Sequence, residues 1–131
     1  MLIEEEITNK ILAAAFKVHS ELGPGLLESA YKECLCYQMM QDGLKVEKEK
    51  SVPLFYDGIK LDLEYRLDIM VQDKIVIETK AVKELDDVHM AQILTYLRLS
   101  NCEVGLLLNF KVVSLKNGIK RVYLKKREPL S

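Results

Sequence analysis

Hydrophobic residues near the start of the chain recur at helical spacing. The first such set consists of Ile3, Ile7, Ile11, Ala14 or Ala15, Val18 and Leu22. Because residues three or four apart share one face of a helix, this set predicts an amphipathic helix that ends at the Gly-Pro-Gly of residues 23–25. A second helical pattern runs from Leu26 to about Asp42 and stops at Asp42-Gly43. Its expected inner residues are Leu27, Ala30, Cys34 and Leu35.

Extended patterns follow these two helices. Two runs on either side of Tyr56-Asp57-Gly58, together covering residues 51–71, predict a hairpin. A third run, within residues 73–82, is rich in β-branched residues and predicts another strand. We expect the last two strands to pair across a turn at Gln72–Lys74.

The second half of the chain alternates in the same way. A helical pattern covers about Asp86 to Ser100, with Asp86 or Asp87 as the cap. The uninterrupted apolar run at residues 103–110 is typical of a strand covered on both faces. Residues 112–124 predict a hairpin that turns at Asn117-Gly118. The expected order is roughly ααβββαβββ, a mixed α/β (α+β) domain built on a mixed sheet.

Composition and charge limit the class of protein. The chain has 131 residues, 49% of them hydrophobic and 30% charged, so residues 1–131 fit one domain with one core. The net charge of −1 lacks the strong positive bias of many nucleic-acid-binding proteins. A polyanionic partner would therefore have to bind a local patch of basic residues. The densest basic run contains Lys120, Arg121, Lys125, Lys126 and Arg127. It is either a solubilising edge or a phosphate-contacting strip.

The sequence also indicates the compartment and argues against zinc. Three glutamates stand near the N-terminus where a signal peptide needs positive charge, and no run of ~18 apolar residues occurs, so we expect a cytoplasmic protein without a membrane partner. Cys34, Cys36 and Cys102 lack zinc-site spacing, and His19 and His89 lie outside any metal motif. We expect reduced structural thiols.

The hairpin at residues 65–80 raises a chemical question. Pairing Val71 with Ile75 keeps the apolar residues of both strands together, with the first set formed by Leu67, Ile69 and Val71 and the second by Ile75, Ile77 and Thr79. The same register places Asp68 opposite Glu78, and Arg66 opposite Lys80. Like charges on cross-strand neighbours are destabilising, so two opposed carboxylates need a proton or a cation between them.

Oxygen-rich sites of this kind suit a hard divalent ion. Mg²⁺ or Mn²⁺ prefers carboxylate and carbonyl ligands, and the backbone carbonyl of Thr79 offers a further oxygen beside Asp68 and Glu78. The alternative is structural. In that interpretation the two acids are exposed hairpin charges that pair with Arg66 and Lys80 across the strands.

These residues resemble a known motif. Asp68, nine intervening residues and then Glu78-Thr79-Lys80 resemble the PD-(D/E)XK pattern of restriction-endonuclease-like nucleases. Residues 25–31 (GLLESAY), 89–97 (HMAQILTYL) and 104–110 (VGLLLNF) are similar to the GxxExxY family within that superfamily. The resemblance runs from about Ile7 to Leu124. It departs from the family at Leu67, where proline is usual, and at Lys111, where glycine is expected.

The resemblance implies a restriction-endonuclease-like core and a Mg²⁺- or Mn²⁺-dependent nuclease. Carried over by position, it assigns Glu28, Asp68, Glu78 and Thr79 to the metal. It makes Lys80 the catalytic lysine, puts Gln92 at the site and leaves Tyr31 and Tyr96 in support. Glu28 also fits a first-turn acid favoured by the helix dipole, Gln92 and Tyr96 a polar helix face, and Tyr31 a packing residue.

The implied partner is nucleic acid, with DNA expected ahead of RNA. A second function class stays open, namely a non-catalytic nucleic-acid-binding or assembly module that keeps the fold. The small size and near-neutral charge of the chain favour that class. The sequence leaves a homodimer open.

Overall fold

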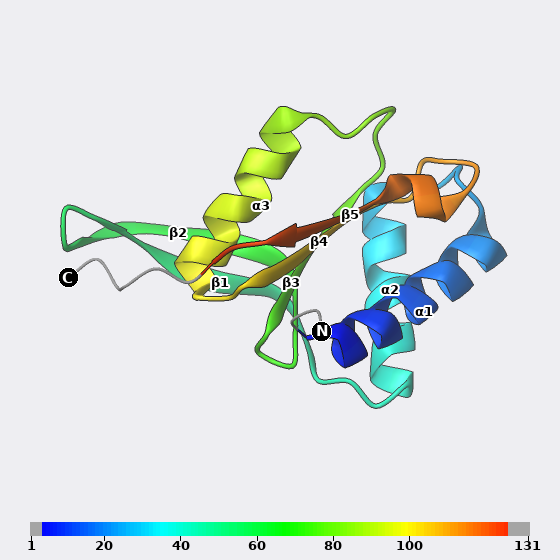
Figure 1. Cartoon of the computed structure of the whole chain (residues 1–131), viewed down its shortest axis with the longest axis horizontal. Coiled ribbons are helices and arrows are strands. Elements are labelled where there is room, and N and C mark those ends of the chain that lie inside the picture. Colours follow the sequence, from blue (N-terminus) through cyan, green and yellow to red (C-terminus); the bar gives the residue numbers. More distant parts are fainter. Residues whose placement is uncertain (1–3, 126–131) are drawn as a thin grey trace.

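A five-stranded mixed sheet with helices on both faces forms the body of the protein (Figure 1). The computed structural model describes residues 4–125. In chain order the elements are α1 (Glu5–Leu22), α2 (Glu28–Gln41), β1 (Val46–Tyr56), β2 (Ile59–Val71), β3 (Ile75–Lys80), α3 (Asp87–Ser100), β4 (Val104–Asn109), the 3-10 helix η1 (Leu115–Gly118) and β5 (Ile119–Tyr123). The strands lie in the order β1-β2-β3-β4-β5. The β3–β4 pair is parallel and the other pairs are antiparallel.

The helix boundaries follow the signals in the sequence. Gly23 ends α1 with a φ of 71°, a left-handed backbone conformation that glycine adopts without strain. Asp86 caps α3 by accepting the backbone N–H of His89. The start of α2 was predicted too early, because Leu27 precedes the helix and its side chain is 78% exposed. Within residues 4–125, no helix combines the length and the apolar character needed to cross a bilayer.

The predicted hairpin at Asn117-Gly118 is wrong. Residues 115–118 form η1, and the single strand β5 follows and pairs with β4. Gly118 is required for close packing rather than for a hairpin turn, because a Cβ atom there would collide with the carbonyl oxygen of Asn109. The described residues therefore contain five strands in the order ααβββαββ, one strand fewer than predicted.

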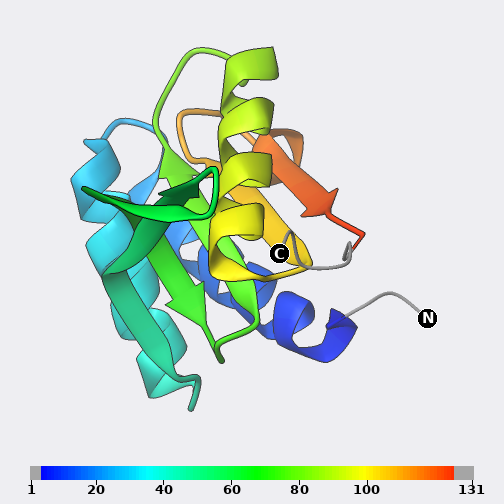
Figure 2. The same cartoon turned by 90° about the vertical axis from the view of Figure 1, so that its left-hand side faces the viewer.

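Two apolar clusters cover the two faces of the sheet. One joins α1 and α2 to the sheet and includes Ile11, Tyr31, Ile77 and Phe110. The other joins α3 to the opposite face and includes Leu67, Ile93 and Leu97. Figure 2 shows the sheet between α3 on one side and the α1–α2 pair on the other. All six residues of β4 are buried, which confirms the prediction of a strand covered on both faces.

The regular alternation of β2 side chains between the two faces of the sheet is interrupted at Asp68. Ile69 and Val71 belong to the cluster under α1 and α2, whereas Leu67 belongs to the cluster under α3. The prediction that all three share a face is therefore wrong for Leu67. The change coincides with an irregularity in β1, where Glu49 has a φ of 51° and lies unpaired between the Lys48–Ile69 and Lys50–Leu67 pairs.

Candidate functional site

The strands β2 and β3 separate at the acidic residues. Val71 pairs with Ile75, as the sequence predicted, and the ladder of backbone pairs ends at Ile69–Ile77. The residue that precedes Ile69 is Asp68. Because the ladder stops before Asp68, backbone groups on both strands need other hydrogen-bond partners there.

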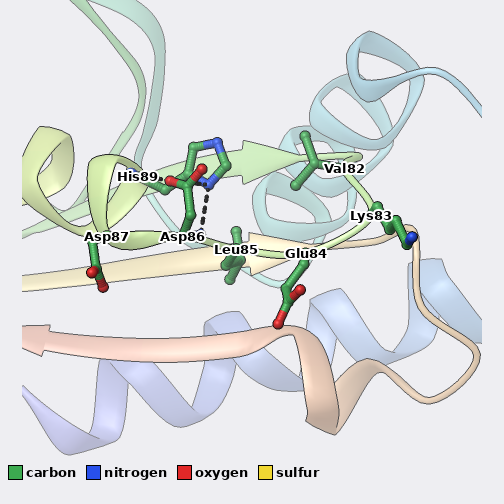
Figure 3. Close-up of a pocket in the computed structure, with 7 residues that line it drawn as sticks. All are labelled: Val82, Lys83, Glu84, Leu85, Asp86, Asp87 and His89. Atoms are coloured by element: carbon green, nitrogen blue, oxygen red, sulfur yellow. Dashed lines mark hydrogen bonds and ion pairs between the residues drawn. The ribbon is translucent and has the colours of Figure 1, made fainter.

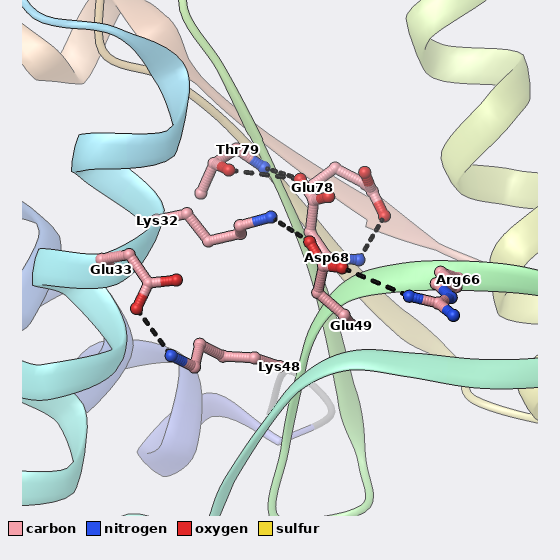
Figure 4. A network of polar contacts seen from close by, with 8 residues as sticks. All are labelled: Lys32, Glu33, Lys48, Glu49, Arg66, Asp68, Glu78 and Thr79. Carbon is pink, nitrogen blue, oxygen red and sulfur yellow. Dashed lines mark hydrogen bonds and ion pairs between the residues drawn. The ribbon is translucent and has the colours of Figure 1, made fainter.

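Carboxylates provide these partners. The backbone N–H of Asp68 donates to Oε1 of Glu78 at 3.2 Å, and the backbone N–H of Thr79 donates to Oδ2 of Asp68 at 3.0 Å. The Thr79 hydroxyl donates to the same Asp68 oxygen at 3.2 Å. Figure 4 shows both acid side chains inserted where the strands diverge. The two carboxylates are thus fixed side by side, as the register predicted.

Burial and repulsion act on Glu78. Glu78 is only 4% exposed. This burial, and to a lesser extent the negative charge of Asp68, raises the pKa of Glu78 to about 8. The alternative of exposed hairpin charges does not fit this burial. Nor does Arg66 serve the pair, because its Nη1 lies 3.7 Å from Glu49 instead. Burial and the charge of Asp68 therefore favour the protonated form of Glu78.

A chain of polar side chains lies next to the acids. Nζ of Lys80 donates to Oε1 of Gln92 at 3.4 Å, and Nε2 of Gln92 donates to the hydroxyl of Tyr96 at 3.1 Å. Tyr96 is 9% exposed, and burial together with the charge of Glu78 raises its pKa. Since Gln92 and Tyr96 lie one turn apart on α3, the helix directs both side chains toward the strand that carries Glu78 and Lys80.

Comparison with protein families identifies the superfamily of the chain. A model of the PD-(D/E)XK nuclease superfamily matches residues 5–122, which is most of the chain. The chain belongs to the PD-(D/E)XK nuclease superfamily. A comparison with curated proteins and one with solved structures each give no match. The superfamily consists of nucleases that generally use Mg²⁺ or Mn²⁺.

The structure does not bring Glu28 to the motif acids. Glu28 is the first residue of α2 and is exposed. Among residues 4–125, no three His, Cys, Asp or Glu side chains are grouped closely enough to share a metal ion. The expectation that Glu28 approaches Asp68 and Glu78 is therefore not met in this conformation. A first-turn acid that interacts favourably with the helix dipole accounts for its position.

Lys32 and Glu49 lie beside the site and were not predicted from the sequence. Lys32 projects from α2, and its Nζ donates to Oε1 of Glu49 at 2.5 Å (Figure 4). This hydrogen bond, together with the charge of Asp68, raises the pKa of Lys32 against the opposing effect of burial. Lys32 lies four residues after Glu28, but nothing in that spacing connects it to a residue in β1. Because this contact depends on the backbone irregularity at Glu49 in β1, no periodic pattern in the sequence predicts it.

Several residues that carry the family resemblance are structural. The Tyr31 hydroxyl donates to the carbonyl of Gly23 and accepts from the N–H of Leu26, so it ties down the turn between α1 and α2. Its ring stacks on Phe110 with centroids 4.7 Å apart. Asn109 fixes the loop after β3, because its side chain bonds both the N–H and the carbonyl of Val82. These contacts position the strands that carry the site.

An open pocket of about 650 Å³ lies over the loop between β3 and α3 (Figure 3). Its lining consists of Val82, Lys83, Glu84, Leu85, Asp86, Asp87 and His89. Asp86 and His89 already bond each other as the capping box of α3. None of the motif residues lines this pocket, so we do not assign the candidate site to it.

The remaining predicted residues lie elsewhere. Lys120 and Arg121 are exposed on the edge strand β5, and exposed Lys125 follows it. Lys126 and Arg127 lie outside the described residues. His19 bonds the carbonyl of Val112 through Nε2 at 2.8 Å. Burial raises the pKa of the Cys36 thiol to about 11, which disfavours the thiolate that a metal would need.

The pKa of Glu78 predicts how stability depends on pH in the presence of a chelator. The folded state holds this proton up to about pH 8, whereas the unfolded chain releases it near 4.5. Stability from this group is complete below the lower pKa and is lost as pH rises through the upper one, by about 1.4 kcal/mol per pH unit between them. Glu78→Gln should remove this loss. In urea unfolding, the free energy of unfolding of the variant should therefore rise relative to that of the parent protein from about pH 5 to about pH 8.

A matched control is Glu64→Gln, which changes an exposed acid on the same strand that carries Asp68. Its free energy of unfolding should follow that of the parent at each pH. Parallel pH curves for the parent and Glu78→Gln would show that Glu78 ionises normally.

Proposed function

We propose that this protein is a Mg²⁺- or Mn²⁺-dependent nuclease of the GxxExxY type that hydrolyses phosphodiester bonds, with DNA as the expected substrate. The observation that carries the proposal is that Asp68 and Glu78 lie beside each other where β2 and β3 separate, with Lys80 two residues beyond Glu78 on β3. Gln92 extends this group from α3 through its hydrogen bond with Lys80. Membership of a nuclease superfamily supports the same reaction class.

The donor set fits a hard divalent cation. Two carboxylates fixed beside each other offer oxygen ligands. Burial and the charge of Asp68 raise the pKa of Glu78, and a positive ion would offset both effects. Asp68, Glu78 and the carbonyl of Thr79 would hold the ion. Because Mg²⁺ usually keeps several water ligands, a site with few protein ligands is sufficient.

The side chains have distinct roles in the proposed hydrolysis. A bound divalent ion would neutralise charge on the phosphoryl oxygens and lower the pKa of an attacking water. Lys80 carries an ammonium that can orient this water or stabilise the charge that develops on the phosphate. Gln92 holds Lys80 from α3, and Tyr96 holds Gln92 in turn. Hydrolysis then joins the water oxygen to phosphorus, breaks the bond to the sugar oxygen and returns a proton to that oxygen.

One observation favours the alternative of a non-catalytic module. Glu28 is exposed and stands apart from the acidic pair, so the third carboxylate expected of the family is not in place. In this alternative the fold would bind nucleic acid or a partner without cutting. The exposed basic residues Lys120, Arg121 and Lys125 would supply phosphate contacts in either case.

A cleavage panel separates the two functions. Purified protein is incubated with labelled single- and double-stranded DNA and RNA in Mg²⁺, in Mn²⁺ and with a chelator. We expect cleavage of DNA that requires the metal, and none by Glu78→Gln purified in the same way. Binding without cleavage in every lane would favour the module. Equal cleavage by parent and variant would reveal a contaminating nuclease.

A further inference from the structure

The strands β1 and β2 continue beyond the body of the protein as a two-stranded arm. Figure 1 shows this ribbon projecting past α3, away from α1 and α2. We define the arm as residues 53–65, which span the turn at Asp57-Gly58. Two-stranded hairpins are marginally stable at best in water unless another layer covers them. The arm is therefore a part of the fold that would gain stability from a partner.

One face of the arm is apolar. Along β2 the apolar and charged residues alternate, so that alternate side chains point to the same face. The exposed apolar residues on this strand are Ile59 (62%), Leu61 (37%), Leu63 (52%) and Tyr65 (40%), and the paired strand adds Tyr56 (74%). The face continues inward to Leu67, which is buried under α3. The opposite face carries Lys60, Asp62 and Glu64, together with one exposed aromatic residue, Phe55, which pairs with Lys60 and is 57% exposed.

The charge of the arm argues against a nucleic-acid partner. The residues of the arm that are charged at pH 7 are one lysine and three acids, namely Lys60, Asp57, Asp62 and Glu64, which gives the arm a net charge of −2. A phosphate backbone would be repelled by this charge, because nucleic-acid affinity depends largely on basic contacts. An apolar protein surface has no such penalty.

The edge of the arm is protected against strand addition. β1 is an edge strand, but Pro53 lacks an N–H donor, and the register of β1 shifts between Pro53 and Phe55. A partner is therefore expected to cover the face of the ribbon rather than extend its edge. Sheets that pack face to face need a second apolar sheet surface.

We propose that the apolar face of the arm is the dimer interface, and that its occupant is the same face of a second copy of this chain. Aromatic side chains contribute roughly 150–250 Å² each and aliphatic ones less, so the exposed fractions amount to at most on the order of 500 Å² per arm. Two arms related by a twofold axis would bury at most on the order of 1,000 Å², which reaches the lower bound for a specific interface. Twofold symmetry gives each arm a partner of matching length and chemistry.

This interface would adjoin the candidate site. Tyr65, at the base of the arm, lies with its ring centroid 6.2 Å from that of Tyr96, which bonds Gln92. Dimerisation would thus place two candidate sites in one assembly. The inference does not depend on catalysis, because it rests on the arm alone.

Sedimentation velocity over low to high micromolar concentrations tests the proposal without any cleavage assay. The parent protein should be a dimer. The double variant Ile59→Glu, Leu63→Glu should raise the dimer dissociation constant by at least ~100-fold, the scale of removing central interface residues. Val113→Glu is the matched control, because Val113 is 94% exposed but lies outside the arm, and it should dimerise like the parent.

Three results would overturn the proposal. A parent protein that stays monomeric at all concentrations has no such interface. A double variant that dimerises as tightly as the parent would place the interface elsewhere. A monomeric parent whose binding to single-stranded DNA is weakened by the double variant would make nucleic acid the occupant instead.

Discussion

Replacing Asp68 with Asn and Glu78 with Gln in one variant is expected to lower single-turnover cleavage by on the order of 10³-fold or more. A bound metal ion supplies several kcal/mol of charge stabilisation to the transition state, and each 1.4 kcal/mol changes a rate about tenfold. The same variant should lose the metal-dependent rise in melting temperature. For the parent, Mn²⁺ at 100 times its dissociation constant should add about 2.7 kcal/mol of stability, or roughly 10 °C.

The amide substitutions are suited to this test because they leave the fold's hydrogen bonds possible. An amide oxygen can still accept from the N–H of residue 68 and from the N–H of Thr79, where the carboxylates accept now. Thermal melts with chelator should therefore show that the double variant is folded. If its melting temperature rises with Mn²⁺ as that of the parent does, the metal binds at a different place.

Lys80→Ala should separate catalysis from metal binding. A protonated lysine cannot ligate a cation, so the variant should bind Mn²⁺ with an affinity close to that of the parent. Its single-turnover cleavage rate should nevertheless fall by ~10²-fold or more, the scale found when one preorganised electrostatic group is deleted. Mn²⁺ titration and cleavage measured on the same preparation give both quantities.

Lys83→Ala is the control for this variant, because Lys83 is an exposed lysine on the loop that follows the same strand. It should cleave like the parent. If Lys80 only forms a hydrogen bond with Gln92, its loss should cost about 0.5–1.5 kcal/mol of stability and leave cleavage unchanged. Full activity in Lys80→Ala would refute the proposed role of the lysine.

Local patterns were sufficient for much of the fold. The end of α1 at Gly23 and the cap of α3 at Asp86 depend on backbone chemistry within a few residues. The pairing of Val71 with Ile75 was predictable because any slip by one residue would turn apolar side chains to the wrong face. That register in turn placed Asp68 beside Glu78.

Long-range packing decided the features that the sequence did not reveal. Leu67 lies on the α3 side because the alternation of β2 changes at Asp68, next to the irregular residue Glu49. Asn117-Gly118 resembles a hairpin turn, but the glycine is needed to let η1 approach Asn109. Neither the change of face at Asp68 nor the approach of η1 to Asn109 alters the local pattern of apolar residues, so hydrophobic periodicity could not predict either feature.

The candidate site likewise contains residues that the sequence predicted and residues that only long-range packing brings together. Asp68, Glu78 and Lys80 follow from one register, and Gln92 meets Lys80 across the sheet–helix packing that the family resemblance implied. Lys32 comes near Asp68 through the packing of α2 against the sheet, which spacing along the chain does not encode. Glu28 was assigned by resemblance alone, and its role stays a prediction.

The location of a bound Mn²⁺ ion tests the central claim most directly. Crystals grown with Mn²⁺ and measured for anomalous scattering should give a peak in contact with the carboxylates of both Asp68 and Glu78, beside the carbonyl of Thr79. Crystals of the Asp68→Asn, Glu78→Gln variant, grown in the same way, should lack this peak. A Mn²⁺ peak that lies away from both carboxylates in the parent protein would contradict the proposed metal site.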